Sequence, residues 1–116
     1  MRLWLGIAAV NGVLAVAAGA FAAHGLRAHL APDMLAVWET GARYHMYHAL
    51  AMALAAIAGS RWPPAFFLAG IVLFSGSLYA LALTGIGWLG AITPLGGALL
   101  IAGWTCLAIS AFRKQS

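Results

Sequence analysis

The stretch PPAFFLAGIVLFSGSLYALALT, residues 63–84, decides the fold class. It contains no charged residue, and it is as long as the roughly 20 helical residues that cross a hydrocarbon core of about 30 Å. Proline is tolerated at its start because the first turn of a helix has no partner for the missing N–H. We therefore predict a transmembrane helix over residues 64–84.

The whole chain has the composition of a membrane protein. Of its 116 residues, 65% are hydrophobic and 7% are charged, and the mean hydropathy is +0.98. An average soluble domain is about 45–50% apolar. The net charge of +4 comes from scattered basic residues that form no patch of the kind nucleic-acid binding requires. We expect a single membrane domain over residues 1–116, with the lipid bilayer as its partner and no nucleic-acid partner.

Two more apolar runs predict spans directly. Residues 3–23 are interrupted only by Asn11 and exceed the roughly 7–15 apolar residues of a signal-peptide core, so we interpret them as a retained helix. Thr93-Pro94 opens the last run, which ends before Arg113-Lys114.

One further span has to be inferred by counting. The apolar run 49–59 is too short to cross a bilayer, but about 20 residues counted back from Arg61 start a span near Gly41. The sequence RYHMYHAL, residues 43–50, then lies inside this span. We expect an all-α integral membrane four-helix bundle with spans over about 3–23, 41–60, 64–84 and 94–112.

The distribution of charge predicts the orientation. Four spans place both termini on one side, together with Arg2, Arg61, Arg113 and Lys114. On the opposite side the basic residues Arg27 and Arg43 are offset by Asp33 and Glu39. The positive-inside rule therefore places both termini in the cytoplasm, and we expect a bacterial inner (plasma) membrane location.

The segment between the first two spans, residues 24–40, is the one sizeable polar connection. Pro32-Asp33 is a plausible helix start, and Met34, Val37 and Trp38 then share one face, as in an interfacial amphipathic helix. We expect this short amphipathic segment to continue into the second span, with Gly41 as a possible bend.

Polar side chains gather in the half of the bundle away from the termini. At about 1.5 Å per residue, His48 lies roughly 10 Å inside the boundary. Ionisable groups at such depth are functional candidates, although hydrogen bonds between helices explain them equally well. For Tyr44, His45 and Tyr47 an interfacial belt is the favoured interpretation. The candidate ligand or structural cluster consists of His24, Tyr44, His48, Ser75, Ser77 and Tyr79.

A metal or haem site is the weaker alternative. His45 and His48 share a helix face, which Met52 continues, and His24 could add a third nitrogen. No carboxylate joins them, and Cys106 is the only cysteine, so we expect no cofactor. Ser75 and Ser77 lie in mid-helix and do not form a hydrolase nucleophile elbow, which argues against an enzyme.

Small residues suggest close helix packing. Spacings such as Ala15, Gly19 and Ala23, or Gly76 and Ala80, let helix backbones approach. We expect packing contacts at Gly19, Gly76, Gly96 and Gly97.

Several motifs together resemble one known family. They are GAFAAHGL (19–26), YHMYHALA (44–51), LFSGSLYALAL (73–83), ITPLGG (92–97) and GW (103–104). Their order along nearly the whole chain is similar to that of the transmembrane protein 256 / YgdD-like small membrane proteins, a domain of unknown function. The resemblance implies four spans in an inner or mitochondrial membrane and no established activity. Because glutamine is frequent in that family at the position of His45, the resemblance favours His24 and His48 as site residues.

Three functions remain open from the sequence. The first is a non-enzymatic module, either a monomer or a homo-oligomer, that binds a small ligand, a lipid head group or another membrane protein. The second is a small oligomeric transporter or channel. The third is a redox protein that binds a metal, haem or quinone.

Overall fold

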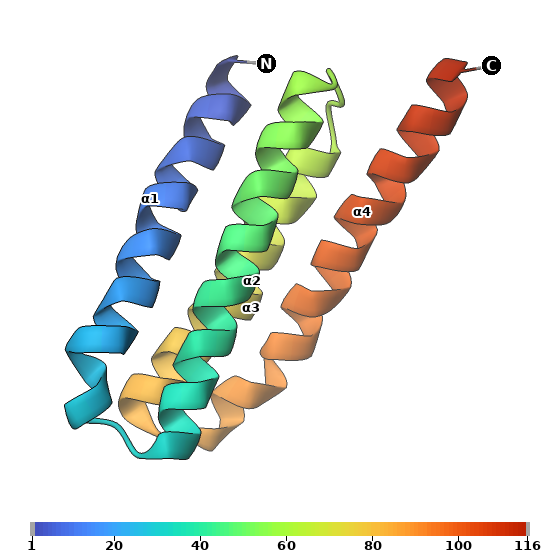
Figure 1. The fold of residues 1–116 in the computed structure, drawn as a ribbon. Helices are drawn as coiled ribbons and strands as arrows, with labels where there is room; N and C mark the ends of the chain where they lie inside the picture. The colour runs from blue at the N-terminus through green and yellow to red at the C-terminus, as the bar shows by residue number, and fades with distance from the viewer. Residues whose placement is uncertain (1, 116) are drawn as a thin grey trace.

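The computed structural model describes residues 2–115, which form four long helices joined by short connections (Figure 1). These are α1 (Arg2–His24), α2 (Pro32–Ile57), α3 (Pro63–Thr84) and α4 (Thr93–Gln115). Two short 3₁₀ helices, η1 (Leu26–Ala28) and η2 (Gly87–Ala91), lie at the end opposite both chain ends. The predicted all-α fold of four helices is confirmed.

Proline and glycine set the boundaries of α3. Pro63 occupies the first turn, as predicted. The helix stops at Gly85, whose φ of +72° is a left-handed conformation that glycine adopts at little cost, and its N–H bonds the carbonyl of Leu81. Local chemistry alone therefore gives this helix the length that a bilayer requires.

Three helical segments are long and apolar enough to cross a membrane: Arg2–His24, Pro63–Thr84 and Gly87–Lys114. The exception is α2, whose middle carries the histidines and tyrosines of RYHMYHAL. This helix packs against both α1 and α3, and many of its side chains are buried between them. A helix shielded in this way tolerates polar residues because neighbouring helices, not lipid, contact them.

The bend expected at Gly41 is wrong. α2 runs unbroken from Pro32 to Ile57, so the amphipathic segment and the second span are one helix. Gly41 instead marks a close approach of α2 to α3. A Cβ at this position would lie 3.1 Å from the Tyr79 ring and 3.3 Å from Cβ of Leu78.

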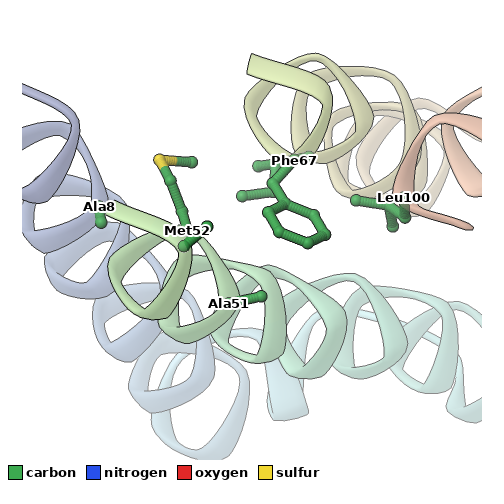
Figure 2. Close-up of a cluster of buried hydrophobic side chains, with 7 residues drawn as sticks. Ala8, Ala51, Met52, Phe67 and Leu100 are labelled. Carbon is green, nitrogen blue, oxygen red and sulfur yellow. The ribbon is translucent and has the colours of Figure 1, made fainter. Parts of the chain in front are cut away.

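The helices pack in chain order, α1 on α2, α2 on α3 and α3 on α4. Figure 2 shows the central contact, in which Met52 of α2 and Phe67 of α3 are fully buried between Ala8 of α1 and Leu100 of α4. A second cluster, formed by Ala22, Leu26, Trp38 and Ala82, closes the end near the loops. In lipid, such packing stabilises through van der Waals contact more than through exclusion of water.

The outer surface is apolar along the helices and aromatic near the ends. Val13 and Ile101 are 68% and 69% exposed, as side chains that face acyl chains would be. Trp62, before α3, and Trp88, in η2, are also exposed, at opposite ends of α3. Tryptophan at both ends is typical of the two interfaces of a bilayer.

Two of the four predicted packing glycines do not pack. A Cβ added at Gly19 or Gly76 would meet nothing within 4 Å, because Gly19 is exposed and Gly76 borders a groove between α1 and α3. A Cβ at Gly97 would make an ordinary contact, 3.7 Å from the Phe74 ring. Only Gly96 is sterically required, since its Cβ would overlap the backbone of Phe74 on α3.

Sequence spacing missed other close approaches between α3 and α4. At Gly70 a Cβ would overlap the Leu100 side chain and lie 3.1 Å from the carbonyl oxygen of Gly96. At Gly103 it would lie 2.6 Å from the Phe67 ring. These contacts depend on how each helix is rotated about its axis, which a small-residue spacing does not specify.

Candidate functional site

A chain of hydrogen bonds joins α1, α2 and α3 near the middle of the bundle. The His45 ring lies between two partners, with Nδ1 at 3.0 Å from the Tyr79 hydroxyl and Nε2 at 3.0 Å from Oδ1 of Asn11. Asn11 in turn donates from Nδ2 to the carbonyl of Ile7 at 2.9 Å. Asn11 and His45 are buried, and Tyr79 is half-buried.

The direction of each bond follows from the donors available. Because Nδ2 of Asn11 serves the Ile7 carbonyl, its Oδ1 faces His45 and must accept, so Nε2 of His45 carries the proton. Nδ1 of the same neutral ring then accepts from the Tyr79 hydroxyl. This assignment comes from the bonding network and defines a single tautomer of His45.

His48 forms a separate link, from α2 to α4. Its Nδ1 lies 2.7 Å from the carbonyl of Tyr44 and therefore donates to it, while Nε2 accepts from the indole Nε1–H of Trp104 at 3.1 Å. His48 is thus the opposite tautomer to His45. The ring also contacts Phe67 and Trp104 at centroid distances of 5.8 and 6.2 Å.

The serines make links of the same kind. Ser75 of α3 donates to the carbonyl of Gly41 on α2 at 2.7 Å. Ser77 shares a hydrogen bond of 2.6 Å with Thr93 at the start of α4 and bonds the carbonyl of Phe74 at 2.9 Å. Nearer the loops, the Trp38 indole donates to the carbonyl of Ala18 at 2.8 Å.

The predicted polar cluster therefore divides into several links between helices. Within residues 2–115, no buried side-chain nitrogen or oxygen lacks a hydrogen-bond partner. In a low-dielectric surrounding each buried polar group needs a hydrogen-bond partner, and the bonds made here fix the register of the helices. The structure does not bring the predicted residues around one ligand.

The structure separates the predicted histidines and brings forward His45. His24 is exposed at the end of α1, and no hydrogen bond joins it to His48 in the described part of the chain. His45, which the resemblance disfavoured, is buried at the centre of the three-helix link. The signal that points to it is Asn11, since a lone amide in an apolar helix needs a partner at its own depth.

The histidines also do not form the geometry of a metal site. Across residues 2–115 there is no group of three or more His, Cys, Asp or Glu side chains that could hold a metal ion. His45 and His48 direct their ring nitrogens to different protein partners. Metal-free and haem-free function stays a prediction.

A groove of about 480 Å³ opens between α2 and α4, over the side chains of α3. Its lining is mainly aromatic and aliphatic, and His48 forms part of the wall. The lining residues are Tyr44, Tyr47, His48, Phe74, Gly97, Leu100, Ile101 and Trp104. This volume falls within the range of small-molecule sites, about 300–1,000 Å³.

Two hydroxyls in this groove are free to bind a ligand. The rings of Tyr44 and Tyr47 meet edge to face at 5.5 Å, and both side chains are partly exposed, at 37% and 50%. Neither hydroxyl has a hydrogen-bond partner within residues 2–115, as the bonds of the groove belong to His48 and Trp104. The interfacial-belt interpretation of these tyrosines stays a prediction. Tyr44 contacts Phe74 near the middle of α3, with ring centroids 5.0 Å apart.

A second groove of about 440 Å³ lies over the three-helix link, between α1 and α3. Its polar lining consists of Asn11, His45, Ser75 and Tyr79, all of which already bond within the protein. The first groove, in which two hydroxyls have no protein partner among the described residues, is therefore the better candidate for a ligand site.

Known proteins match the chain along nearly its whole length. Residues 18–97 match the family model described as "Protein of unknown function (DUF423)". A UPF0382 membrane protein of Staphylococcus aureus is 44% identical over 119 residues, covering 97% of this chain and 98% of the relative. The UPF0382 membrane protein YwdK of Bacillus subtilis is 43% identical over 124 residues, with the same two coverages.

No solved structure matches the chain. The relatives carry the printed name of membrane proteins, in agreement with three helical segments that are long and apolar enough to cross a bilayer. The family match covers residues 18–97, and the relatives cover 97% of the chain. The chain belongs to the DUF423 family, whose members in bacteria include the UPF0382 membrane proteins and whose function is unknown.

Proposed function

We propose that this protein is a small membrane binding module that holds an amphiphilic molecule in the groove between α2 and α4. The ligand has a carbonyl-bearing head group and a long apolar tail, a chemistry shared by acyl lipids and prenyl quinones. The observation that carries the proposal is the pair of unpartnered hydroxyls, on Tyr44 and Tyr47, in the wall of an aromatic groove of about 480 Å³.

The tyrosines suit the head group of such a ligand. Each phenol can donate one hydrogen bond to a carbonyl oxygen, and no protein group competes for that bond. Both residues precede His48 on α2 and so lie on the side of the groove nearer the loops. Tyr44 contacts Phe74 near the middle of α3, with ring centroids 5.0 Å apart, so these donors would hold a head group within the length of the helices and not at their ends.

The rest of the lining suits a tail. Phe74, Leu100 and Ile101 present only carbon atoms to the groove, and Ile101 is 69% exposed. The His48–Trp104 hydrogen bond withdraws the remaining polar atoms of the wall from competition. An apolar chain can therefore lie along α4 without covering an unsatisfied polar group.

Filling the groove tests this proposal. Ile101→Trp places a large ring in the groove and leaves every hydrogen bond between helices intact, and Leu95→Trp, at a 62% exposed position of α4 outside the groove, is the control. Wild type and Leu95→Trp should retain a bound amphiphile through detergent exchange, and Ile101→Trp should lose it. Mass spectrometry of extracts from the purified proteins distinguishes acyl lipids from quinones, and equal retention by all three would contradict the proposal.

The membrane topology completes the proposal. We propose that α2 also spans the bilayer, giving four spans within one domain, and that both termini face the cytoplasm of a bacterial inner membrane. Arg2, Arg61, Arg113 and Lys114 at the end that holds the termini support this orientation. A reporter that fluoresces only in the cytoplasm should be bright when fused after Ser116, whereas activity of a periplasmic reporter at the same site would reverse the orientation.

The relationship to the transmembrane protein 256 / YgdD-like proteins is part of the same proposal. The motifs that suggest it include Tyr44, His48 and Gly97, which line the groove, and Gly96, where α3 and α4 meet. We expect the fold and the groove to extend to those proteins.

A further inference from the structure

A crevice of about 420 Å³ lies at the end of the bundle that holds both termini, away from the amphiphile groove. The turn between α2 and α3 forms one side of it and the last turns of α4 form the other. Three of its lining residues are basic, Arg61 on the turn and Arg113 and Lys114 on α4. Two serines, Ser60 and Ser110, add hydroxyl groups.

Both acidic side chains of the protein lie far from these cations. The chain has two acidic residues, Asp33 and Glu39, and both belong to the first part of α2. At about 1.5 Å per residue, even Glu39 is about 27 Å from the end of α2 at Ile57. Three of the six basic residues of this apolar chain converge on one crevice, far from both acidic side chains, and so present a positively charged site for an anion.

Hydrogen bonds within the protein hold the two sides of the crevice together. The Ser60 and Ser110 hydroxyls bond each other at 3.2 Å and so tie the turn to α4. The Lys114 ammonium donates to the carbonyl of Ala58 at 3.0 Å, which satisfies one carbonyl at the end of α2. An ammonium has three N–H donors, so two remain for a second acceptor.

The position of the crevice along the bundle specifies the kind of anion. Trp62 is 63% exposed on its rim, with the Arg61 guanidinium 5.9 Å from the ring centroid, and exposed tryptophan marks the membrane interface. The phosphate groups of lipids lie at this level. Pro63 and Ile109 add an apolar wall, suited to the glycerol and the first methylenes of a lipid. Basic pockets between transmembrane helices at this level bind anionic head groups.

We infer that this crevice binds the phosphate group of an anionic phospholipid through Arg61, Arg113 and Lys114. The site is separate from the amphiphile groove in residues and in position along α4. The two proposals can therefore fail independently.

The single cysteine provides a direct test. Cys106 lines the crevice and is partly exposed, so a bound lipid should slow its alkylation by N-ethylmaleimide. The purified protein in non-ionic detergent is titrated with phosphatidylglycerol, phosphatidylcholine or inorganic phosphate. We expect protection by phosphatidylglycerol at concentrations where the other two give none.

Arg61→Gln removes one cation that has no role in capping α2, and Arg27→Gln makes the same change in η1 at the opposite end. Arg61→Gln should weaken protection by about fivefold, the effect of one basic residue near an anionic surface, and Arg27→Gln should match wild type. Absence of protection, or equal protection of both variants, would overturn the inference. Equal protection by phosphatidylcholine would refute charge recognition, and equal protection by inorganic phosphate would refute the lipid as its source.

Discussion

At the scale of single residues, the buried polar groups act as links between helices. Tyr79 of α3 donates to His45 of α2, which donates to Asn11 of α1. In a second link, Trp104 of α4 donates to His48 of α2. Each link uses every polar atom that a neutral histidine ring possesses. The two histidines of RYHMYHAL therefore fix the register of the bundle. The hydroxyls of the neighbouring Tyr44 and Tyr47 remain available for a ligand.

Removal of one hydroxyl should separate these two roles. Tyr79→Phe keeps the ring and deletes the donor to His45, so unfolding in mixed micelles should become easier by about 0.6 to 1.7 kcal/mol. Tyr47→Phe is the matched control, because its hydroxyl has no partner among residues 2–115, and its stability should equal that of wild type. Equal stability of the two variants would show that the three-helix link does not stabilise the fold.

At the scale of elements, steric fit sets the distance between helices. α3 approaches α4 at Gly70, Gly96 and Gly103, and approaches α2 at Gly41. Each contact needs a particular face of the helix. The sequence predicted a packing contact at Gly96, which the structure has, but also at Gly19 and Gly76, where a Cβ would meet nothing within 4 Å.

Two glycine-to-alanine changes test this account of helix packing. Gly96→Ala would force α4 away from the Phe74 backbone and should destabilise by about 1–3 kcal/mol, the usual cost of overpacking. Gly76→Ala, in open space on α3, should leave stability unchanged or raise it by up to about 1 kcal/mol through helix propensity. Thermal unfolding in one detergent compares them, and a larger loss for Gly76→Ala would refute the packing arrangement.

At the scale of the whole molecule, much of the architecture is predictable from the sequence. Apolar runs fix the number of helices, and Pro63 and Gly85 fix the ends of α3, because these signals act locally. The continuity of α2 was expected, but the possible bend at Gly41 was wrong, because glycine resembles a bend when only its own helix is considered. The pairing of His45 with Asn11 was missed because it depends on the rotation and relative shift of α1 and α2.

The grooves also belong to the whole molecule. They exist because the helices pack in chain order, which leaves α2 and α4 flanking an open strip of α3. No residue pattern within one helix encodes that opening. The sequence predicted Tyr44 as a polar candidate, but it could not identify the aromatic groove that Tyr44 lines.

Photocrosslinking in native membranes tests the central claim most directly. A benzophenone amino acid at position 101 places the reactive group in the groove, and the same residue at position 95 faces the surrounding bilayer. Mass spectrometry of the adducts should find one enriched amphiphile with a carbonyl-bearing head group at position 101 and a mixture of bulk lipids at position 95. The same mixture at both positions would contradict the account, because the groove would then select no ligand.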